Sequence, residues 1–287
     1  DTDDVFGRVA AAGIEVALNG MVLESGPVRW NSRLQYAANR SRIEKLVTAT
    51  DTLIFGYLNA VTVGQPVGVF YGAYYPRDAE GNVNEAAGWL DASCNPIANT
   101  VGIVASRARG TVNGVACTPL KKFLGSPDPK FTLAWNNDFD IGANTNVSFL
   151  LDGRFGNKVA NFSRRISEYF GAGAANANEQ CPTVAGTVRC QYTLNGERHV
   201  LYEEFVEDGS FVKLREVALR YTMDQDWVRR LGPESVALTL AGRNLHTWTK
   251  YTGIDPEVNL FSANTVARGV EFGTSPIPRT FALGASF

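Results

Sequence analysis

The feature that most constrains this chain is strict alternation between apolar and polar side chains over long segments. In the segment 28–39, apolar or small residues occupy the even positions, and polar residues occupy nearly all the odd ones. The final segment alternates in the same way, with Phe281, Leu283, Ala285 and Phe287 in one phase. Such alternation predicts strands with two different faces. One strand of this kind would also fit a soluble sandwich, but a series of them predicts a membrane barrel.

The series is present. Further alternating segments are 14–22, 131–140, 146–155, 211–222 and 236–243. In the segment 211–222 the phase changes between Leu214 and Val217, which predicts a β-bulge near Arg215 and Glu216. Asp152, Arg154 and Arg243 fall on the polar face, which a barrel turns toward its lumen. Together the segments predict roughly seven spanning strands.

The connections between these strands alternate between short and long. The short ones are 25–27, 141–144 and 224–233, and the long ones are approximately 41–130, 157–208 and 246–278. Outer-membrane barrels have short periplasmic turns and long extracellular loops. We therefore expect the short turns and Phe287 on the periplasmic side, and the long loops outside the cell. We expect short helices at 166–170 and 226–231.

Composition excludes some classes of protein. The formal net charge of the 287 residues is −2, with no basic block, which argues against a nucleic-acid partner. No run of about 18 apolar residues predicts a transmembrane helix, although hydropathy of this kind does not detect half-polar barrel strands. The chain starts at Asp1 without an apolar export sequence, so we expect a mature chain or part of a longer one.

The four cysteines lie in the long connections, at positions Cys94, Cys117, Cys181 and Cys190. Four cysteines allow three pairings. We favour the disulfides Cys94–Cys117 and Cys181–Cys190, because each pair lies within one connection. Four free thiols are the alternative. Disulfides would indicate an oxidising compartment or the cell surface.

Motifs for enzyme chemistry are not found. There are two histidines, and the sequence has no metalloprotease, nucleophile-elbow or phosphate-loop motif. The acid pairs Asp138–Asp140 and Asp255–Glu257 would suit two-carboxylate catalysis, but we interpret them as polar residues of the lumen or loops. We therefore predict no catalytic activity, no cofactor and no metal site.

Aromatic side chains are the better candidates for ligand contacts, because sugars and peptides bind to aromatic surfaces in concave sites. The predicted substrate-binding residues are Tyr74, Tyr75, Trp89, Trp248 and Tyr251. Aromatic residues also form girdles where a barrel meets the membrane surfaces. For Trp30, Tyr36 and Trp135 we favour the girdle interpretation.

Three blocks carry a family resemblance. They are G-S-F-V-K-L-R-E-V-A-L-R-Y-T (209–222), G-R-N-L-H-T-W-T-K-Y-T-G-I-D-P-E-V-N (242–259) and P-R-T-F-A-L-G-A-S-F (278–287). Together they resemble the C-terminal barrel strands of SusC/RagA-type TonB-dependent outer-membrane transporters, and the segments 64–72 and 125–133 show weaker similarity. The resemblance implies an all-β fold, a transmembrane antiparallel β-barrel of 22 strands with a plugged lumen. Residues 1–287 would form its C-terminal portion, without the plug domain.

The resemblance also implies a function, which is the TonB-dependent import of a bulky hydrophilic nutrient, a glycan or a peptide, across the bacterial outer membrane. The implied partners are the TonB complex acting through a plug, a SusD-like surface lipoprotein, outer-membrane lipid, and the remaining barrel strands from the same or another chain. One alternative is a barrel that acts as a structural scaffold in a surface assembly. Another is a secreted β-sandwich that binds carbohydrate.

Overall fold

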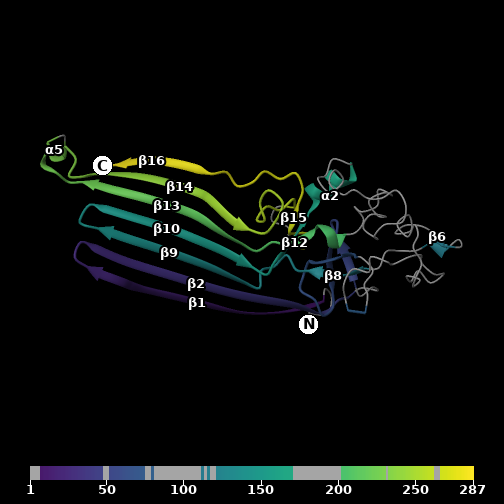
Figure 1. Cartoon of the computed structure of the whole chain (residues 1–287). Coiled ribbons are helices and arrows are strands. Elements are labelled where there is room, and N and C mark those ends of the chain that lie inside the picture. The colour runs from purple at the N-terminus through teal and green to yellow at the C-terminus, as the bar shows by residue number, and fades with distance from the viewer. Residues whose placement is uncertain are drawn as a thin grey trace.

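The computed structural model describes residues 7–47, 52–74, 79–80, 111–112, 115–116, 121–170, 202–230, 232–261 and 266–287. These residues form two parts, a long curved sheet and a smaller unit at one end of it (Figure 1). We call the smaller unit the cap; it comprises 52–74, 121–126, 158–170, 202–208, 250–261 and 266–277. None of the helices in the described part of the chain has the length and apolar character that crossing a membrane requires.

The long sheet is antiparallel and has seven strands in the order β1-β2-β9-β10-β13-β14-β16. Their bounds are β1 (Arg8–Ser25), β2 (Val28–Lys45), β9 (Phe131–Ile141), β10 (Thr145–Phe155), β13 (Phe211–Met223), β14 (Val236–Thr249) and β16 (Thr280–Ser286). Each strand pairs with the one that precedes it in this order. The predicted number of spanning strands and the all-β fold class are confirmed.

The strand register separates the side chains into two chemically different faces. Residues directly opposite each other across an antiparallel pair project from the same face. One such row crosses six strands and is mostly apolar, with Leu18, Leu34, Trp135, Leu151, Leu214 and His246. The neighbouring row is mostly polar, with Asn19, Arg33, Asn136, Leu150, Glu216 and Arg243. We call these the apolar face and the polar face of the sheet.

The apolar face is not covered by a second sheet. Leu18 is 63% exposed, Phe281 is 75% exposed and Leu283 is 79% exposed. In a soluble sandwich the inner faces of two sheets pack together and bury such residues. Leu34 and Leu238 are 39% and 40% exposed, which argues against the sandwich alternative.

The predicted bulge in β13 is confirmed. In the pairing with β10, the two-residue step from Leu214 to Glu216 opposes the single step from Leu151 to Leu150. The pairing with β14 is irregular at the same level, where that step opposes the three-residue step from His246 to Arg243. Arg215 is the inserted residue, so Leu214 and Val217 both project from the apolar face. Arg215 in turn projects from the polar face, beside Lys213.

The three short connections lie together at one end of the sheet, and the C-terminus lies at the same end (Figure 1). Gly26 and Gly142 have φ angles of 54° and 65°, which residues other than glycine rarely adopt. The longest of these connections contains α5 (Asp226–Arg229), at the position where we expected a short helix. The long connections lead to the cap at the other end, so the predicted separation of short and long connections is confirmed.

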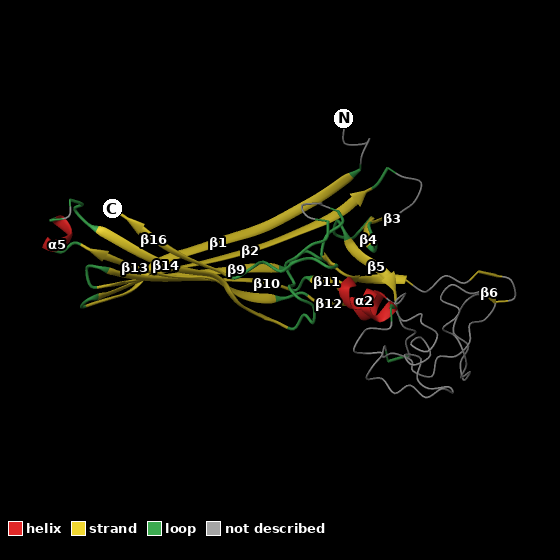
Figure 2. Ribbon diagram, turned by 90° about the horizontal axis from the view of Figure 1, so that it is seen from above, coloured by secondary structure: helices red, strands yellow, loops and turns green. Residues whose placement is uncertain are grey.

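The cap contains short strands and helices from parts of the chain that are far apart in sequence (Figure 2). One sheet has the order β3 (Thr52–Phe55), β4 (Asn59–Thr62), β5 (Val69–Ala73) and β8 (Lys121–Gly125), and another has β12 (Val206–Asp208), β11 (Lys158–Asn161) and β15 (Val270–Glu271). Beside them lie α2 (Phe162–Tyr169) and η3 (Tyr202–Phe205), while β6 (Thr111–Val112) pairs separately with β7 (Val115–Ala116). The described parts of the long connections thus contain more strands and helices than predicted.

A closed apolar core holds the cap together. Leu58, Phe70, Ala160, Phe162 and Val270 are each at most 1% exposed and pack against one another. Tyr57 adds its ring to this core, 4.9 Å from that of Phe162. All four cysteines lie outside the described residues, and the predicted disulfides remain predictions.

Candidate functional site

The aromatic residues predicted to bind substrate lie in different surroundings. Tyr251 is 5% exposed, and its hydroxyl donates a hydrogen bond to Oε2 of Glu271 at 3.3 Å. Trp248 projects from the apolar face, opposite Val212, with its ring 4.6 Å from that of His246. The ring of Tyr74 lies 4.6 Å from Nζ of Lys122. The structure therefore does not gather these three rings into one site.

Tyr75 and Trp89 lie outside the described residues. The five-residue substrate site consequently remains a prediction, and only Tyr74 keeps a half-buried ring in the polar surroundings of the cap.

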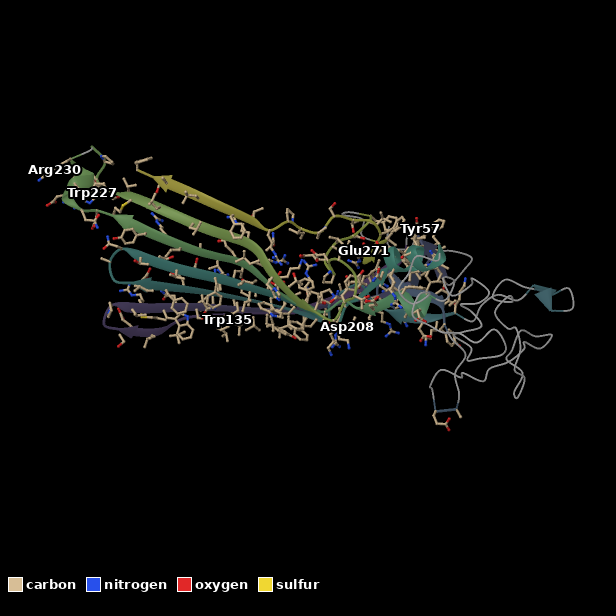
Figure 3. All side chains as sticks on the ribbon, turned by 45° about the horizontal axis from the view of Figure 1, so that its top comes forward. Tyr57, Trp135, Asp208, Trp227, Arg230 and Glu271 are labelled. Atoms are coloured by element: carbon tan, nitrogen blue, oxygen red, sulfur yellow. The ribbon has the colours of Figure 1, made fainter. Side chains whose placement is uncertain are left out.

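Trp30 and Trp135 lie on the apolar face, where we expected girdle residues. Each forms a hydrogen bond with a polar side chain of the same face. The indole N–H of Trp30 donates to Oδ1 of Asn137 at 2.9 Å, and that of Trp135 donates to Oγ of Ser32 at 2.9 Å. Trp30 also stacks on Phe139, with ring centroids 5.5 Å apart. Figure 3 shows Trp135 on the sheet, far from Glu271 and Tyr57 in the cap. The two indole rings thus satisfy Oδ1 of Asn137 and Oγ of Ser32 on the apolar face.

A cluster that the sequence did not predict lies where the polar face meets the cap. We call it the ion-pair network. Its members are Asp152 and Arg154 from β10, Lys213 and Arg215 from β13, and Asp255 and Glu257 from the connection after β14. It joins three cations to three anions. The network connects two adjacent strands of the sheet to a segment that lies 42 residues beyond Lys213, at Asp255, and 103 residues beyond Arg154, at Glu257.

Lys213 lies at the centre of the network. It is only 2% exposed, and its Nζ donates to Oδ1 and Oδ2 of Asp255 at 2.8 and 3.0 Å. A third bond reaches Oε2 of Glu257 at 2.9 Å. A buried ammonium group with all three donors in use satisfies the requirement that buried charges be paired and hydrogen-bonded.

Arginine residues complete the network around Glu257. Arg215 donates to both Glu257 oxygens, at 2.8 and 2.7 Å, and also to Oδ2 of Asp152 at 2.6 Å. Arg154 adds a further bond to Oε1 of Glu257 at 3.0 Å. Two planar guanidinium groups therefore hold one carboxylate by short, charge-assisted bonds.

Local sequence explains how the network forms. Asp152 lies opposite Lys213 in the register, which places both side chains on the polar face. The bulge then keeps Arg215 on that face as well. Within the turn after β14, the backbone N–H of Glu257 donates to Oδ1 of Asp255 at 3.0 Å, a local bond that aspartate favours in turns. This turn directs both acidic side chains toward β13.

The electrostatics indicate an anchor and not an acid–base catalyst. Burial raises the pKa of the Glu257 carboxyl, but hydrogen bonds from Arg215 and Lys213 outweigh burial and bring the pKa to about 2. A general acid or base needs a pKa near the working pH. Glu257 remains ionised at neutral pH, so the Asp255–Glu257 pair fixes the connection to the strands.

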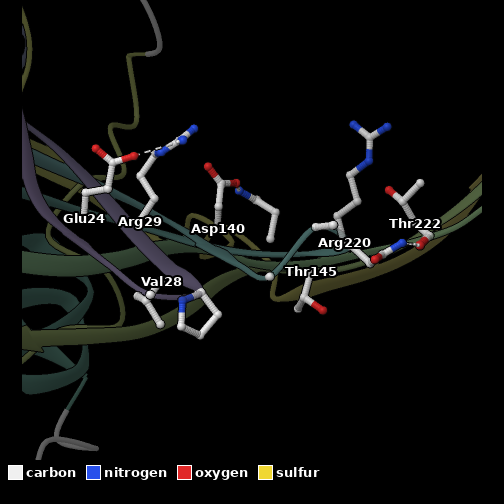
Figure 4. Close-up of a pocket in the computed structure, with 13 residues that line it drawn as sticks. Glu24, Val28, Arg29, Asp140, Thr145, Arg220 and Thr222 are labelled. Carbon is white, nitrogen blue, oxygen red and sulfur yellow. Dashed lines mark hydrogen bonds and ion pairs between the residues drawn. The ribbon is translucent and has the colours of Figure 1, made fainter.

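The other acid pair, Asp138 and Asp140, lies on the polar face further from the cap. Nδ2 of Asn146 donates to Oδ1 of both, at 2.9 Å in each case. Asp140 also lines a cavity of about 780 Å³ near the short turns, together with Arg29 and Arg220 (Figure 4). This polar-face cavity holds side chains of both charges, as a lumen filled with water would.

The cap contains a second buried carboxylate, at Glu271. This residue is 0% exposed and accepts hydrogen bonds from Oγ of Ser163 at 2.7 Å and from Tyr251. Burial and the nearby Glu271 carboxylate raise the pKa of Tyr251 above its ordinary value. Among the side chains that the structure describes, no group of histidine, cysteine, aspartate and glutamate could hold a metal ion.

The fold and this arrangement define a class of protein. A single antiparallel sheet with an exposed apolar face, a polar face, short turns at one end and a folded cap at the other is the wall of an outer-membrane barrel. With its two sheet edges unpaired among the described residues, the sheet fits a portion of a larger barrel.

Comparison with known proteins agrees with this class. No family model matches the chain. TonB-dependent receptor P3 of Formosa agariphila is 27% identical over 97% of this chain, and TonB-dependent receptor P26 of the same organism is 27% identical over the same share. The chain spans 28% and 29% of the length of these two relatives. The resemblance to TonB-dependent transporters is thereby confirmed.

Solved structures show the same fold. The RagAB peptide importer in its closed-closed state superposes with a TM-score of 0.63 and 18% identity, over 97% of this chain and 29% of that one. A second structure of the RagAB peptide transporter gives a TM-score of 0.65 at 16% identity, over 98% of this chain and 29% of the other. The curated relatives are named as receptors and the solved structures as importers or transporters, which is consistent with a protein that is not an enzyme.

Proposed function

We propose that residues 1–287 form the C-terminal portion of the barrel of a TonB-dependent importer in the bacterial outer membrane. The imported nutrient would be bulky and hydrophilic, a peptide or a glycan. The observation that carries this proposal is the separation of mostly apolar from mostly polar side chains across the seven-stranded sheet. One face suits hydrocarbon and the other suits a passage for a polar solute.

The length of the apolar face supports a membrane position. On β2 it extends from Val28 to Ala38. Ten steps of about 3.3 Å give roughly 33 Å along the strand. At a tilt of about 40°, this corresponds to a band roughly 25 Å high, which is the height of the apolar band on outer-membrane barrels.

The ion-pair network supports a role for the cap in import. It fixes the connection 250–261 to the polar face, at the end of the sheet where the long connections emerge. A solute that enters the barrel would pass this connection and the cap. The residues Tyr74, Tyr75 and Trp89 of the first long connection are our candidates for contacts with the solute.

The orientation and the partners form part of the proposal. The long connections and the cap face the cell exterior, and Phe287 lies at the periplasmic side. A SusD-like surface lipoprotein covers the mouth, and the TonB complex acts through a plug domain that lies outside these 287 residues. The solved RagAB structures, described as a peptide importer, support the choice of this substrate class.

Uptake in living cells tests the proposal. Cells that carry the full-length protein take up a labelled peptide or oligosaccharide mixture, and the same cells without TonB lose that uptake. Unchanged uptake without TonB would rule out energised import. If removal of the protein disrupts a surface assembly and leaves uptake intact, the structural scaffold is the better description.

A further inference from the structure

The apolar face of β2 changes its chemistry abruptly toward the cap. Ala38 is opposite Ile14, which places it on the apolar face. The next residues on the same face are Arg40, opposite Ala12, and Arg42, opposite Ala10. The strand therefore continues beyond the apolar band with two arginine side chains on the outward face of the wall.

Both arginines are exposed, and the guanidinium of Arg42 lies beside Gly64, whose segment of the cap hydrogen-bonds to the backbone of Ile43. Their partners on β1 are alanines, and the pairing of β2 with β9 ends at Ala37, so β9 contributes no neighbour at their level. Neither the Arg40 nor the Arg42 side chain forms an ion pair or hydrogen bond with any residue in the described part of the chain. Glu44, two residues beyond Arg42 on β2, forms an ion pair with Nε of Arg8 at 3.1 Å.

We infer that Arg40 and Arg42 bind the phosphate groups of anionic lipid in the outer leaflet. This inference rests on the proposed membrane position of the sheet. Two residues apart on one face of a strand, the side chains start about 7 Å from each other. Guanidinium groups bind phosphate with two parallel hydrogen bonds, so the pair can hold two phosphates or bracket one.

Depth in the membrane selects the lipid headgroup as the occupant. The apolar face ends at Ala38, so the guanidinium groups lie at the height where hydrocarbon gives way to headgroups. Long cationic side chains near the end of an apolar band extend toward this layer. Each arginine near an anionic surface contributes about 1 kcal/mol to binding.

The chain offers a matched control on the same strand. Arg33 is also exposed, but it projects from the polar face, opposite Asn19 and Asn136. A lipid in the membrane touches the outward face alone. Arg33→Gln therefore removes the same charge from β2 without changing the proposed lipid site.

The test uses the full-length protein, purified in a non-ionic detergent, and titrates it with phosphorylated lipid A and with the dephosphorylated glycolipid. We expect binding of the phosphorylated form only, weakened by salt. Arg40→Gln lowers the affinity roughly fivefold, and Arg40→Gln with Arg42→Gln lowers it roughly 30-fold. Arg33→Gln leaves it unchanged.

Three results would overturn the inference. They are equal affinity of the double variant and the unaltered protein, an equal loss in Arg33→Gln, and full competition by inorganic phosphate at the same concentration, which would indicate a site for soluble phosphate. Insertion of each variant into lipid vesicles is measured in parallel. Failure of the unaltered protein to insert defeats the proposed function as well, whereas normal insertion with unchanged affinities defeats only the lipid site.

Discussion

The cap and the sheet treat apolar side chains in opposite ways. In the cap, Phe70 and Phe162 are at most 1% exposed and form a dry interior. In the sheet, Phe281 is 75% exposed and Leu283 is 79% exposed. Both parts obey the same rule, that apolar surface leaves water. The difference shows that the cap supplies its own apolar surroundings, whereas the sheet requires them from outside the chain.

The largest effect should come from the cap core. Phe162→Ala removes a fully buried ring and leaves a cavity, so we expect the free energy of opening the cap to fall by about 3–5 kcal/mol. Hydrogen exchange of the full-length protein in detergent measures this opening, because amides in local units report their own stability. Amides of β9 and β10 should keep their protection. Equal loss of protection in the sheet would show that the two parts are not independent.

The next effect tests the connection between the two parts. Lys213→Met leaves Asp255 and Glu257 without their central cation, and breaking a buried pair costs about 3 kcal/mol. Faster exchange at 252–258 would show that the turn has detached. Arg243→Gln is the control, since its bond to Glu216 joins side chains that are 62% and 36% exposed and should contribute under about 1 kcal/mol. Similar effects of both variants would contradict an anchoring role for the network.

The same charge placed first on one face of the sheet and then on the other tests directly whether the surroundings of the two faces differ. Leu240→Arg puts an arginine on the apolar face, and we expect it to reduce the free energy of unfolding of the protein in lipid vesicles by about 2 kcal/mol. Thr239→Arg puts the same side chain on the polar face, with little expected effect. The measurement is the folded fraction of the full-length protein across a urea series. A greater loss for Thr239→Arg would reverse our assignment of the faces.

The smallest effect should be the pH dependence of the network. The pKa of Glu257 is lowered to about 2, so the folded state favours the ionised carboxylate. This contribution to stability is fully present above the ordinary pKa of about 4.5, and it is lost as the pH falls from there through about 2. Exchange of the amides at 252–258 should therefore accelerate below pH 4.5. Glu257→Gln should remove most of this dependence, and an unaltered pH profile in that variant would assign it to another group.

Alternation was sufficient to predict the sheet. Successive side chains of a strand project from opposite faces, so a strand with one apolar and one polar face repeats its pattern every two residues. It even located the bulge, since Arg215, an extra residue relative to β10, reverses the phase of β13. The cap could not be predicted this way. Its β11 pairs with β15 in parallel through Ala160–Val270 and Asn161–Glu271 alone, and such short segments carry no pattern.

The ion-pair network was only half visible in the sequence. Lys213 and Arg215 share a strand phase, and the D-P-E-V-N block marked Asp255 and Glu257 as part of a resemblance. Their partnership depends on how the connection after β14 folds back across the strand, which local spacing does not encode. Paired charges on one strand, followed by paired opposite charges in the next long connection, would have been a useful indication.

The two margins of the sheet differ greatly in length. β1 spans 18 residues, whereas β16 spans 7. Each margin presents backbone groups that hydrogen bonds from a further strand would satisfy. A neighbour that joins at β1 can therefore form more than twice as many rungs as one that joins at β16. Of the two seams that complete the barrel beside this sheet, the one at β16 would then have fewer backbone hydrogen bonds to hold it closed.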